Sequence, residues 1–235
     1  MYDKASSGRQ TRTKRAKKDM AKVAKDAIFR MSETKRHNVL YNEFHQTTGS
    51  ISSHELTNIN QGDETNQRTG RQILGQGIKI RSFVHNNGTY EPIIVKFMMV
   101  QAKSGVTTDP GDATNPVWVK ARHDNPTTFN VIGGTQALLY ELDPDQYSVL
   151  YQKQFQLEAS PYPNTTEDGA RFGGKHSAKY FEKYIKLGGR KINFDSTTCQ
   201  NKLWLVWWTV QLDSDQITGT DMEVSANCNL TFKDF

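Results

Sequence analysis

The stretch MEVSANCNLTF at residues 222–232 decides the fold class of this 235-residue chain. Apolar side chains occupy every second position, at Val224, Ala226, Cys228, Leu230 and Phe232, and polar side chains stand between them. Because successive side chains of a β-strand point to opposite faces, this alternation predicts a strand with one buried face and one face in water.

Short segments with the same rhythm recur from residue 39 onwards, separated by clusters of Gly, Pro, Asn and Asp. We predict eight strands, at residues 51–59, 70–84, 91–103, 116–122, 146–158, 178–194, 202–212 and 222–232. Eight short strands are the number that a jelly roll needs. The predicted fold is therefore all-β: an eight-stranded single jelly roll of two packed antiparallel sheets, with a basic, partly helical N-terminal arm.

One predicted strand, LWLVWWTV at residues 203–210, is apolar on both of its faces. In a two-layer sandwich one face of such a strand meets the core, and the other needs a long loop or another subunit to cover it. We favour another subunit. This predicts that Trp204, Trp207 and Trp208 belong to a subunit interface.

Positive charge is concentrated at the start of the chain. Residues 1–36 hold twelve Lys and Arg against four acids, a net charge of +8, whereas the remaining residues carry a net charge of −3. Residues 1–18 are polar and basic, which is typical of a segment that stays disordered until it meets a polyanion. From Asp19 to Met31 the apolar residues fall at helical spacing, so a short basic amphipathic helix follows.

We therefore divide the chain into a basic arm, residues 1–38, and a jelly-roll shell domain, residues 39–235. The helix has three open interpretations: it rests on the domain, it binds nucleic acid and packs on neighbouring copies, or it lies on a membrane surface. We favour nucleic acid. The arm residues predicted to contact phosphates are Arg9, Arg12, Lys14, Arg15, Lys17, Lys18, Lys22, Lys25, Arg30, Lys35 and Arg36.

A second basic stretch, residues 171–191, interleaves Lys and Arg with Tyr180, Phe181 and Tyr184. Basic side chains attract phosphates and aromatic rings stack on unpaired bases, so we assign Lys175, Lys179 and Lys183 to nucleic-acid binding. The alternative is a strand with a solvated basic edge and core aromatics. Alternation here is too irregular to show which side chains share a face.

Other classes of function find no support in the sequence. It contains no signal-peptide pattern and no apolar run long enough to cross a bilayer, and Cys199 and Cys228 lack metal-ligand spacing. Residues 169–176 imitate a phosphate-binding loop, but His176 stands where the magnesium-binding Ser or Thr belongs. We expect no enzyme activity, no cofactor and no metal, although a divalent ion between subunits stays open.

Two stretches resemble a known family. INQGDETNQRTGRQILGQGIKIRSFV at residues 59–84 and DQYSVLYQKQFQLE at 145–158 are similar to the capsid protein of circular single-stranded DNA viruses of the circovirus and geminivirus kind. The matching positions are Gln67, Arg68, Gly70, Ile73, Ile78, Ile80, Tyr147, Val149, Leu150, Lys153, Phe155 and Leu157. The arm is shorter and less arginine-dense than in many circovirus coats.

The resemblance implies a capsid protein that assembles with identical subunits, on the smallest (T=1) icosahedral lattice, and packages single-stranded nucleic acid, with DNA favoured. It also implies a location in the virion and, during assembly, in the host nucleus, with an import receptor and a cell-surface receptor as further partners and no membrane. Lys14, Arg15, Lys17 and Lys18 form a compact cluster that suits nuclear import. The alternatives are the coat of a satellite RNA virus, a nucleic-acid chaperone or transport protein, and a glycan-binding jelly roll.

Overall fold

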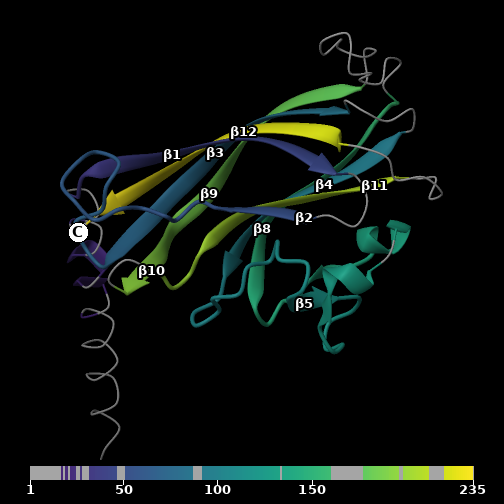
Figure 1. Cartoon of the computed structure of the whole chain (residues 1–235). Helices are drawn as coiled ribbons and strands as arrows, with labels where there is room; N and C mark the ends of the chain where they lie inside the picture. The colour runs from purple at the N-terminus through teal and green to yellow at the C-terminus, as the bar shows by residue number, and fades with distance from the viewer. Residues whose placement is uncertain are drawn as a thin grey trace, which may run out of the picture.

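The structure is a computed structural model that describes residues 17, 19–20, 22–24, 27, 32–46, 51–86, 92–132, 134–159, 177–195, 198–211 and 220–234. Nearly all of its regular structure is β-strand (Figure 1). The strands and 3₁₀ helices are β1 (Thr34–Gln46), β2 (Ile51–Glu55), β3 (Gln72–Asn86), β4 (Ile93–Ala102), β5 (Pro116–Val119), β6 (Thr127–Thr128), η1 (Phe129–Val131), η2 (Gly134–Leu138), β7 (Glu141–Leu142), β8 (Tyr147–Leu157), β9 (Ala178–Asp195), β10 (Thr198–Cys199), β11 (Leu203–Gln211) and β12 (Thr220–Asp234). No helix in these described ranges is long and apolar enough to span a membrane.

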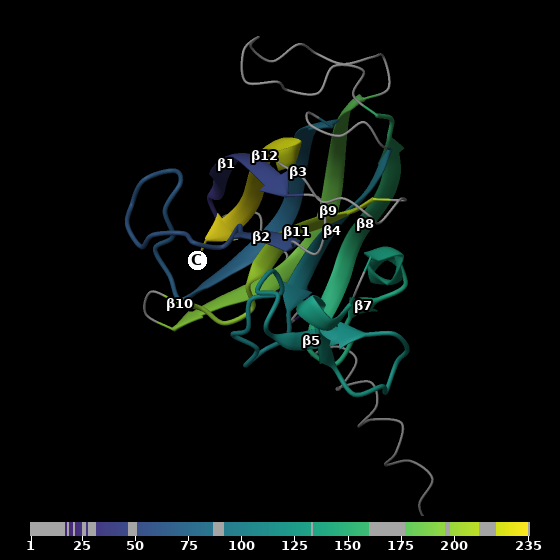
Figure 2. The ribbon, with the colours of Figure 1, turned by 45° about the vertical axis from the view of Figure 1, so that its right-hand side comes forward.

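Two antiparallel sheets pack face to face. One has the strand order β1-β12-β3-β9-β10 and the other has the order β2-β11-β4-β8. The long strands pass repeatedly from one sheet to the other along the chain, and the first strand pairs with the last. This interleaving is the jelly-roll arrangement, so the predicted fold class is confirmed. Figure 2 shows the strands of both sheets from a second direction.

The first strand of the sandwich was not predicted. β1 begins at Thr34, inside the stretch assigned to the arm, and pairs with β12 along its whole length. Its inward positions include Lys35 and His37 as well as Val39 and Tyr41, so the apolar alternation that marks the other strands is weak here. The strand predicted at residues 116–122 is present as β5, but it does not belong to the sandwich. It lies in a small separate sheet with the order β6-β5-β7.

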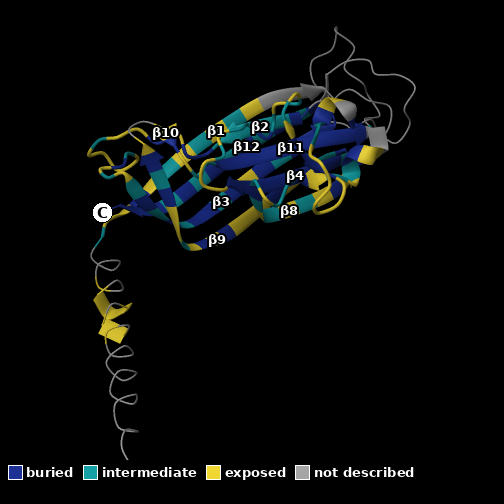
Figure 3. Ribbon diagram, turned by 90° about the horizontal axis from the view of Figure 1, so that it is seen from below, coloured by how far each residue is buried: buried dark blue, intermediate teal, exposed yellow. Residues whose placement is uncertain are grey.

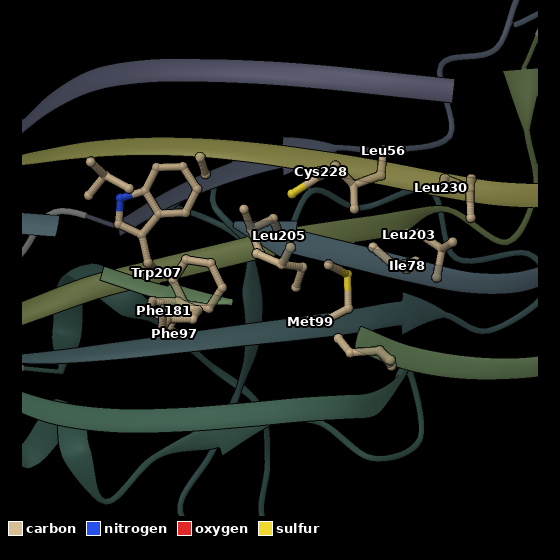
Figure 4. Close-up of a cluster of buried hydrophobic side chains, with 14 of the residues drawn as sticks. Leu56, Ile78, Phe97, Met99, Phe181, Leu203, Leu205, Trp207, Cys228 and Leu230 are labelled. Carbon is tan, nitrogen blue, oxygen red and sulfur yellow. The ribbon is translucent and has the colours of Figure 1, made fainter. Parts of the chain in front are cut away.

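The main core lies between the two large sheets. Trp207, Leu205 and Leu203 of β11 project into it beside Phe97 of β4 and Phe181 of β9 (Figure 4). The rings of Phe97 and Phe181 meet edge to face, with their centroids 5.1 Å apart. The alternating apolar side chains of β12 complete this core, as their pattern predicted.

A second core covers the other face of β11 and corrects the interface prediction. Trp204 and Trp208 pack under residues 104–142 of the same chain, where the Trp208 ring meets Trp118 at 5.0 Å and Phe129 at 5.9 Å between centroids. Trp204, Trp207 and Trp208 are all buried inside the subunit. The prediction that they form a subunit interface is therefore wrong, because a long connection within the chain supplies the cover.

Lys96 holds this cover in place. Its buried ammonium group donates to the carbonyl oxygens of Leu138 at 3.2 Å and Tyr140 at 3.1 Å, and lies 5.1 Å from the centre of the Trp208 ring. Burial lowers the pKa of Lys96, and the carboxylate of Glu141 acts in the opposite direction. The two carbonyl oxygens satisfy a charge that would otherwise be costly inside an apolar cluster.

The two sandwich faces consequently differ. Residues 104–142 cover the outer face of β11 and β4, whereas the outward-facing Gln152, Gln154 and Gln156 of β8 stay exposed. The outer face of the β1-β12-β3-β9 sheet carries polar and charged side chains, and exposed positions alternate along β1 and β9 (Figure 3). This second face is the one that the described parts of the chain leave uncovered.

Candidate nucleic-acid interface

The structure describes some of the side chains predicted to contact phosphates. It describes Lys17, Lys22, Lys35, Arg36, Lys179 and Lys183. The others, Arg9, Arg12, Lys14, Arg15, Lys18, Lys25, Arg30 and Lys175, lie outside the described residues.

The described residues of the arm between positions 17 and 27 are helical and exposed. Lys17 and Lys22 are exposed, and so are Met20 and Val23, each at 68%. An apolar pair left this open does not rest on its own domain, which argues against one of the three interpretations of the helix.

Lys35 is a correction to the set of phosphate contacts. It is the first inward-facing residue of β1, it is only 3% exposed, and its ammonium lies 3.4 Å from the carboxylate of Asp234. The same carboxylate accepts hydrogen bonds from the backbone N–H and hydroxyl of Thr69 and from the backbone N–H of Gly70. Lys35 therefore ties the start of β1 to the end of β12 and is not presented to a ligand.

Lys179 and Lys183 come together with a third lysine that sequence reasoning did not assign to binding. Lys153 of β8 stands across the open edge of the sandwich from β9, with its ammonium 4.5 Å from the centre of the Phe181 ring. The ammonium of Lys179 lies 5.3 Å from the centre of Phe155, and that of Lys183 lies 5.4 Å from the centre of Tyr151. We call Lys153, Lys179 and Lys183 the lysine edge.

Like charges meet at the lysine edge. Partial burial, followed by the charges of Lys179 and Lys183, lowers the pKa of Lys153. Aromatic faces stabilise ammonium groups to a limited extent, but three neighbouring cations still repel one another. An anion placed between them would relieve that repulsion. Lysines at exposed sheet edges also discourage the edge from pairing with another chain, and this structural use needs no ligand.

The aromatic residues of the second basic stretch divide between two faces. Phe181 points into the core, whereas Tyr180 and Tyr184 are 61% and 57% exposed on the outer face of the sheet. Lys179 and Lys183 share the parity of Phe181, so they do not lie beside the exposed tyrosines. In the described part of this stretch, residues 177–191, one aromatic side chain therefore belongs to the core and two are exposed, and the binding of nucleic acid stays a prediction.

Other kinds of site find no candidates in the described ranges. No group of three or more His, Cys, Asp or Glu side chains there could hold a metal ion. Cys199 and Cys228 are both buried and unbridged. Burial raises the pKa of the Cys228 thiol to about 12, which keeps it protonated and unreactive.

Comparison with known proteins adds little to this geometry. No family model and no curated protein sequence matches the chain. Among solved structures, a chain of Desmodium yellow mottle tymovirus is 10% identical, covers 87% of this chain and 90% of its own length, and has a TM-score of 0.35. A chain of the empty head of Turnip yellow mosaic virus is 13% identical over 86% of this chain and 82% of its own, also with a TM-score of 0.35.

Trichodysplasia spinulosa-associated polyomavirus VP1 overlaps 85% of this chain and 94% of its own length at 8% identity, with a TM-score of 0.21. The jelly-roll assignment rests on the strand order of this chain and not on overlaps of this size.

Proposed function

We propose that this chain is a viral capsid protein that assembles with identical copies into a closed shell around single-stranded nucleic acid. The observation that carries the proposal is a jelly-roll sandwich whose first strand continues an N-terminal extension rich in Lys and Arg. Such a chain combines a compact building block with a tether for a polyanion.

The charge distribution supports a division of labour between the two parts. Ten Lys and Arg occur in residues 1–31, before the sandwich begins, whereas the rest of the chain is close to neutral. Contacts of this kind neutralise phosphates without distinguishing sequence, as packaging a whole genome requires. DNA is favoured over RNA because the two motifs at 59–84 and 145–158 resemble those of single-stranded DNA virus capsids.

The strongest alternative is a chaperone or transport protein that binds nucleic acid as a monomer. An uncovered Trp-rich face would have argued against a monomer, but residues 104–142 cover that face. A capsid protein and a chaperone therefore differ in whether the purified chain assembles into particles or stays monomeric. The coat of a satellite RNA virus would also assemble, but around RNA instead of DNA.

We expect the purified chain to form closed particles of uniform diameter that contain nucleic acid. Negative-stain electron microscopy and analytical ultracentrifugation of the full chain measure this directly, and nuclease digestion of the extracted polymer distinguishes DNA from RNA. A protein that stays monomeric both alone and with single-stranded nucleic acid, across salt concentrations, would contradict the capsid proposal and favour the chaperone.

We also propose that Lys14, Arg15, Lys17 and Lys18 direct the subunit to the host nucleus, where a DNA genome would be packaged. A fluorescent reporter fused to residues 1–31 should accumulate in nuclei, and replacing these four residues with Gln should return it to the cytoplasm. A control replaces Lys4, Arg9, Arg12 and Lys22 instead, which removes equal charge from outside the cluster. Equal loss of import in both variants would show that charge alone, rather than the cluster, is responsible.

A further inference from the structure

We infer that the uncovered outer face of the β1-β12-β3-β9 sheet binds single-stranded nucleic acid in a shallow groove lined by Arg36, Asn38, Lys79, Arg81, Tyr184 and Asn229. This inference rests on the proposed function, and it assigns to the body of the subunit a contact that the arm alone does not make. We call this site the sheet groove. It encloses about 560 Å³.

Cross-strand register aligns the side chains of the groove in rows. One row runs Asn38, Asn229, Lys79 and Tyr184 across β1, β12, β3 and β9, and the next runs Leu40, Asn227, Arg81 and Glu182. Arg36 belongs to the row on the other side, which ends at Lys186. Rows two residues apart along a strand lie about 7 Å from one another, so the cations form a band and not a point.

The charge of this band is positive and held in position. Glu182 lies beside the groove, 2.8 Å from the ammonium of Lys79 and 3.0 Å from the Nε of Arg81. One carboxylate thus orients two cations while their side chains stay 40% and 54% exposed. With Arg36 and Lys186 unopposed by this carboxylate, positive charge exceeds negative charge along the band, as a phosphate backbone requires.

Tyr184 provides a surface on which a base can stack. A Cβ atom added to Gly77 of β3 would lie 2.2 Å from the hydroxyl oxygen of Tyr184, so the aromatic ring crosses directly above that glycine. The glycine therefore allows the ring to lie low on the sheet, although 57% of the side chain remains exposed. Bases of every kind can stack on such a ring.

The amide side chains complete the chemistry. Asn38 and Asn229 are directly opposed across β1 and β12, and each offers both a donor and an acceptor. Amides beside cations and an aromatic ring can meet phosphates, sugars and base edges without selecting one base. The groove therefore suits a single-stranded polymer of mixed sequence, because the bases of a duplex are already stacked on one another and leave no face for Tyr184.

The test measures binding of a mixed-sequence single-stranded oligonucleotide to the full chain at several salt concentrations. Arg36→Gln combined with Arg81→Gln should make the negative slope of log affinity against log salt shallower by about 1.4, at about 0.7 for each phosphate contact. The matched control, Lys120→Gln with Arg122→Gln, removes the same charge from exposed positions after β5 and should leave the slope unchanged.

Stacking is tested separately at Tyr184. Tyr184→Leu still covers Gly77 but lacks an aromatic face, so affinity should fall about tenfold, whereas Tyr184→Phe should bind like the original chain. Photocrosslinking with an iododeoxyuridine-substituted oligonucleotide should label the peptide that contains Tyr184.

The inference is overturned if the groove and control variants have equal slopes, if Tyr184→Leu binds normally, or if crosslinks fall only elsewhere. If one of these outcomes occurs but the affinity of the original chain still falls steeply with salt, the packaging proposal stands. If the original chain does not bind the oligonucleotide at all, both the sheet groove and the packaging proposal are overturned.

Discussion

Deleting residues 1–31 should leave the jelly roll folded and make the negative slope of log affinity against log salt shallower by up to about 7. The deletion removes ten Lys and Arg, and each phosphate contact on a single strand contributes about 0.7 to the slope. Particles formed by the shortened chain should be empty or poorly filled. Oligonucleotide titrations across salt concentrations and the ratio of absorbance at 260 and 280 nm measure the two effects.

The end point of this deletion follows from the structure. The carbonyl oxygen of Ser32 accepts a hydrogen bond from Lys233 at 3.0 Å, that of Glu33 accepts one from the backbone of Asp234, and β1 begins at Thr34. Removing residues 1–36 would take away part of β1 and its buried Lys35. A loss of folding after that longer deletion would therefore say nothing about the arm.

Two full-length controls separate charge from length. An arm with its ten Lys and Arg changed to Gln should behave like the deletion, and an arm with Arg changed to Lys should behave like the original chain. If the deletion instead packages normally with an unchanged slope, the charges that matter lie in the body. Changing Lys153, Lys179 and Lys183 to Gln then shows how much of the remaining slope belongs to the lysine edge.

Replacing Asp234 with Asn should destabilise the subunit by about 3–5 kcal/mol, because it leaves the Lys35 ammonium buried without its counter-charge. For a domain of this size the melting temperature should fall by roughly 10 °C. Thermal unfolding followed by circular dichroism measures the change. Asp63→Asn, which removes an exposed carboxylate from the neighbouring loop, is the matched control and should have little effect.

The same site predicts how stability depends on pH. Burial alone would raise the pKa of Asp234, but hydrogen bonds from Thr69, Gly70 and Lys35 outweigh it and lower the pKa below its ordinary value. The carboxylate therefore contributes stability at neutral pH, and that contribution is lost as the pH falls through the lowered pKa. In the Asp234→Asn variant, the free energy of unfolding should therefore fall less as the pH is lowered than it does in the original chain. Identical acid titrations of the two proteins would contradict the role assigned to the Lys35–Asp234 pair.

The sequence predicted most of the sandwich because burial on one face leaves an alternating pattern. It predicted seven of the eight long strands near their observed positions, and it missed β1, whose inward face includes Lys35 and His37. It also identified both apolar faces of β11 correctly. The identity of the cover over Trp204 and Trp208 could not follow from that pattern, because a loop of the same chain and a neighbouring subunit bury apolar side chains equally well.

The candidate sites show the same limit. Lys179 and Lys183 were identified from composition, but Lys153 is distant in sequence and meets them only because β8 and β9 flank the same open edge. The sheet groove depends on register across four strands, which no single stretch of sequence encodes. The position of the Tyr184 ring above Gly77 likewise depends on the pairing of β9 with β3 and its register shift between Gly75 and Gly77.

All four tryptophans of the chain, Trp118, Trp204, Trp207 and Trp208, are buried within one subunit. Their fluorescence emission therefore reports the folding of the subunit and should barely change when subunits associate. Unfolding of the subunit should change the tryptophan emission, whereas dissociation of subunits should not, so the two transitions can be told apart. In the proposed shell the contacts between subunits therefore involve side chains other than tryptophan, so a particle that comes apart into folded subunits should keep its tryptophan emission unchanged.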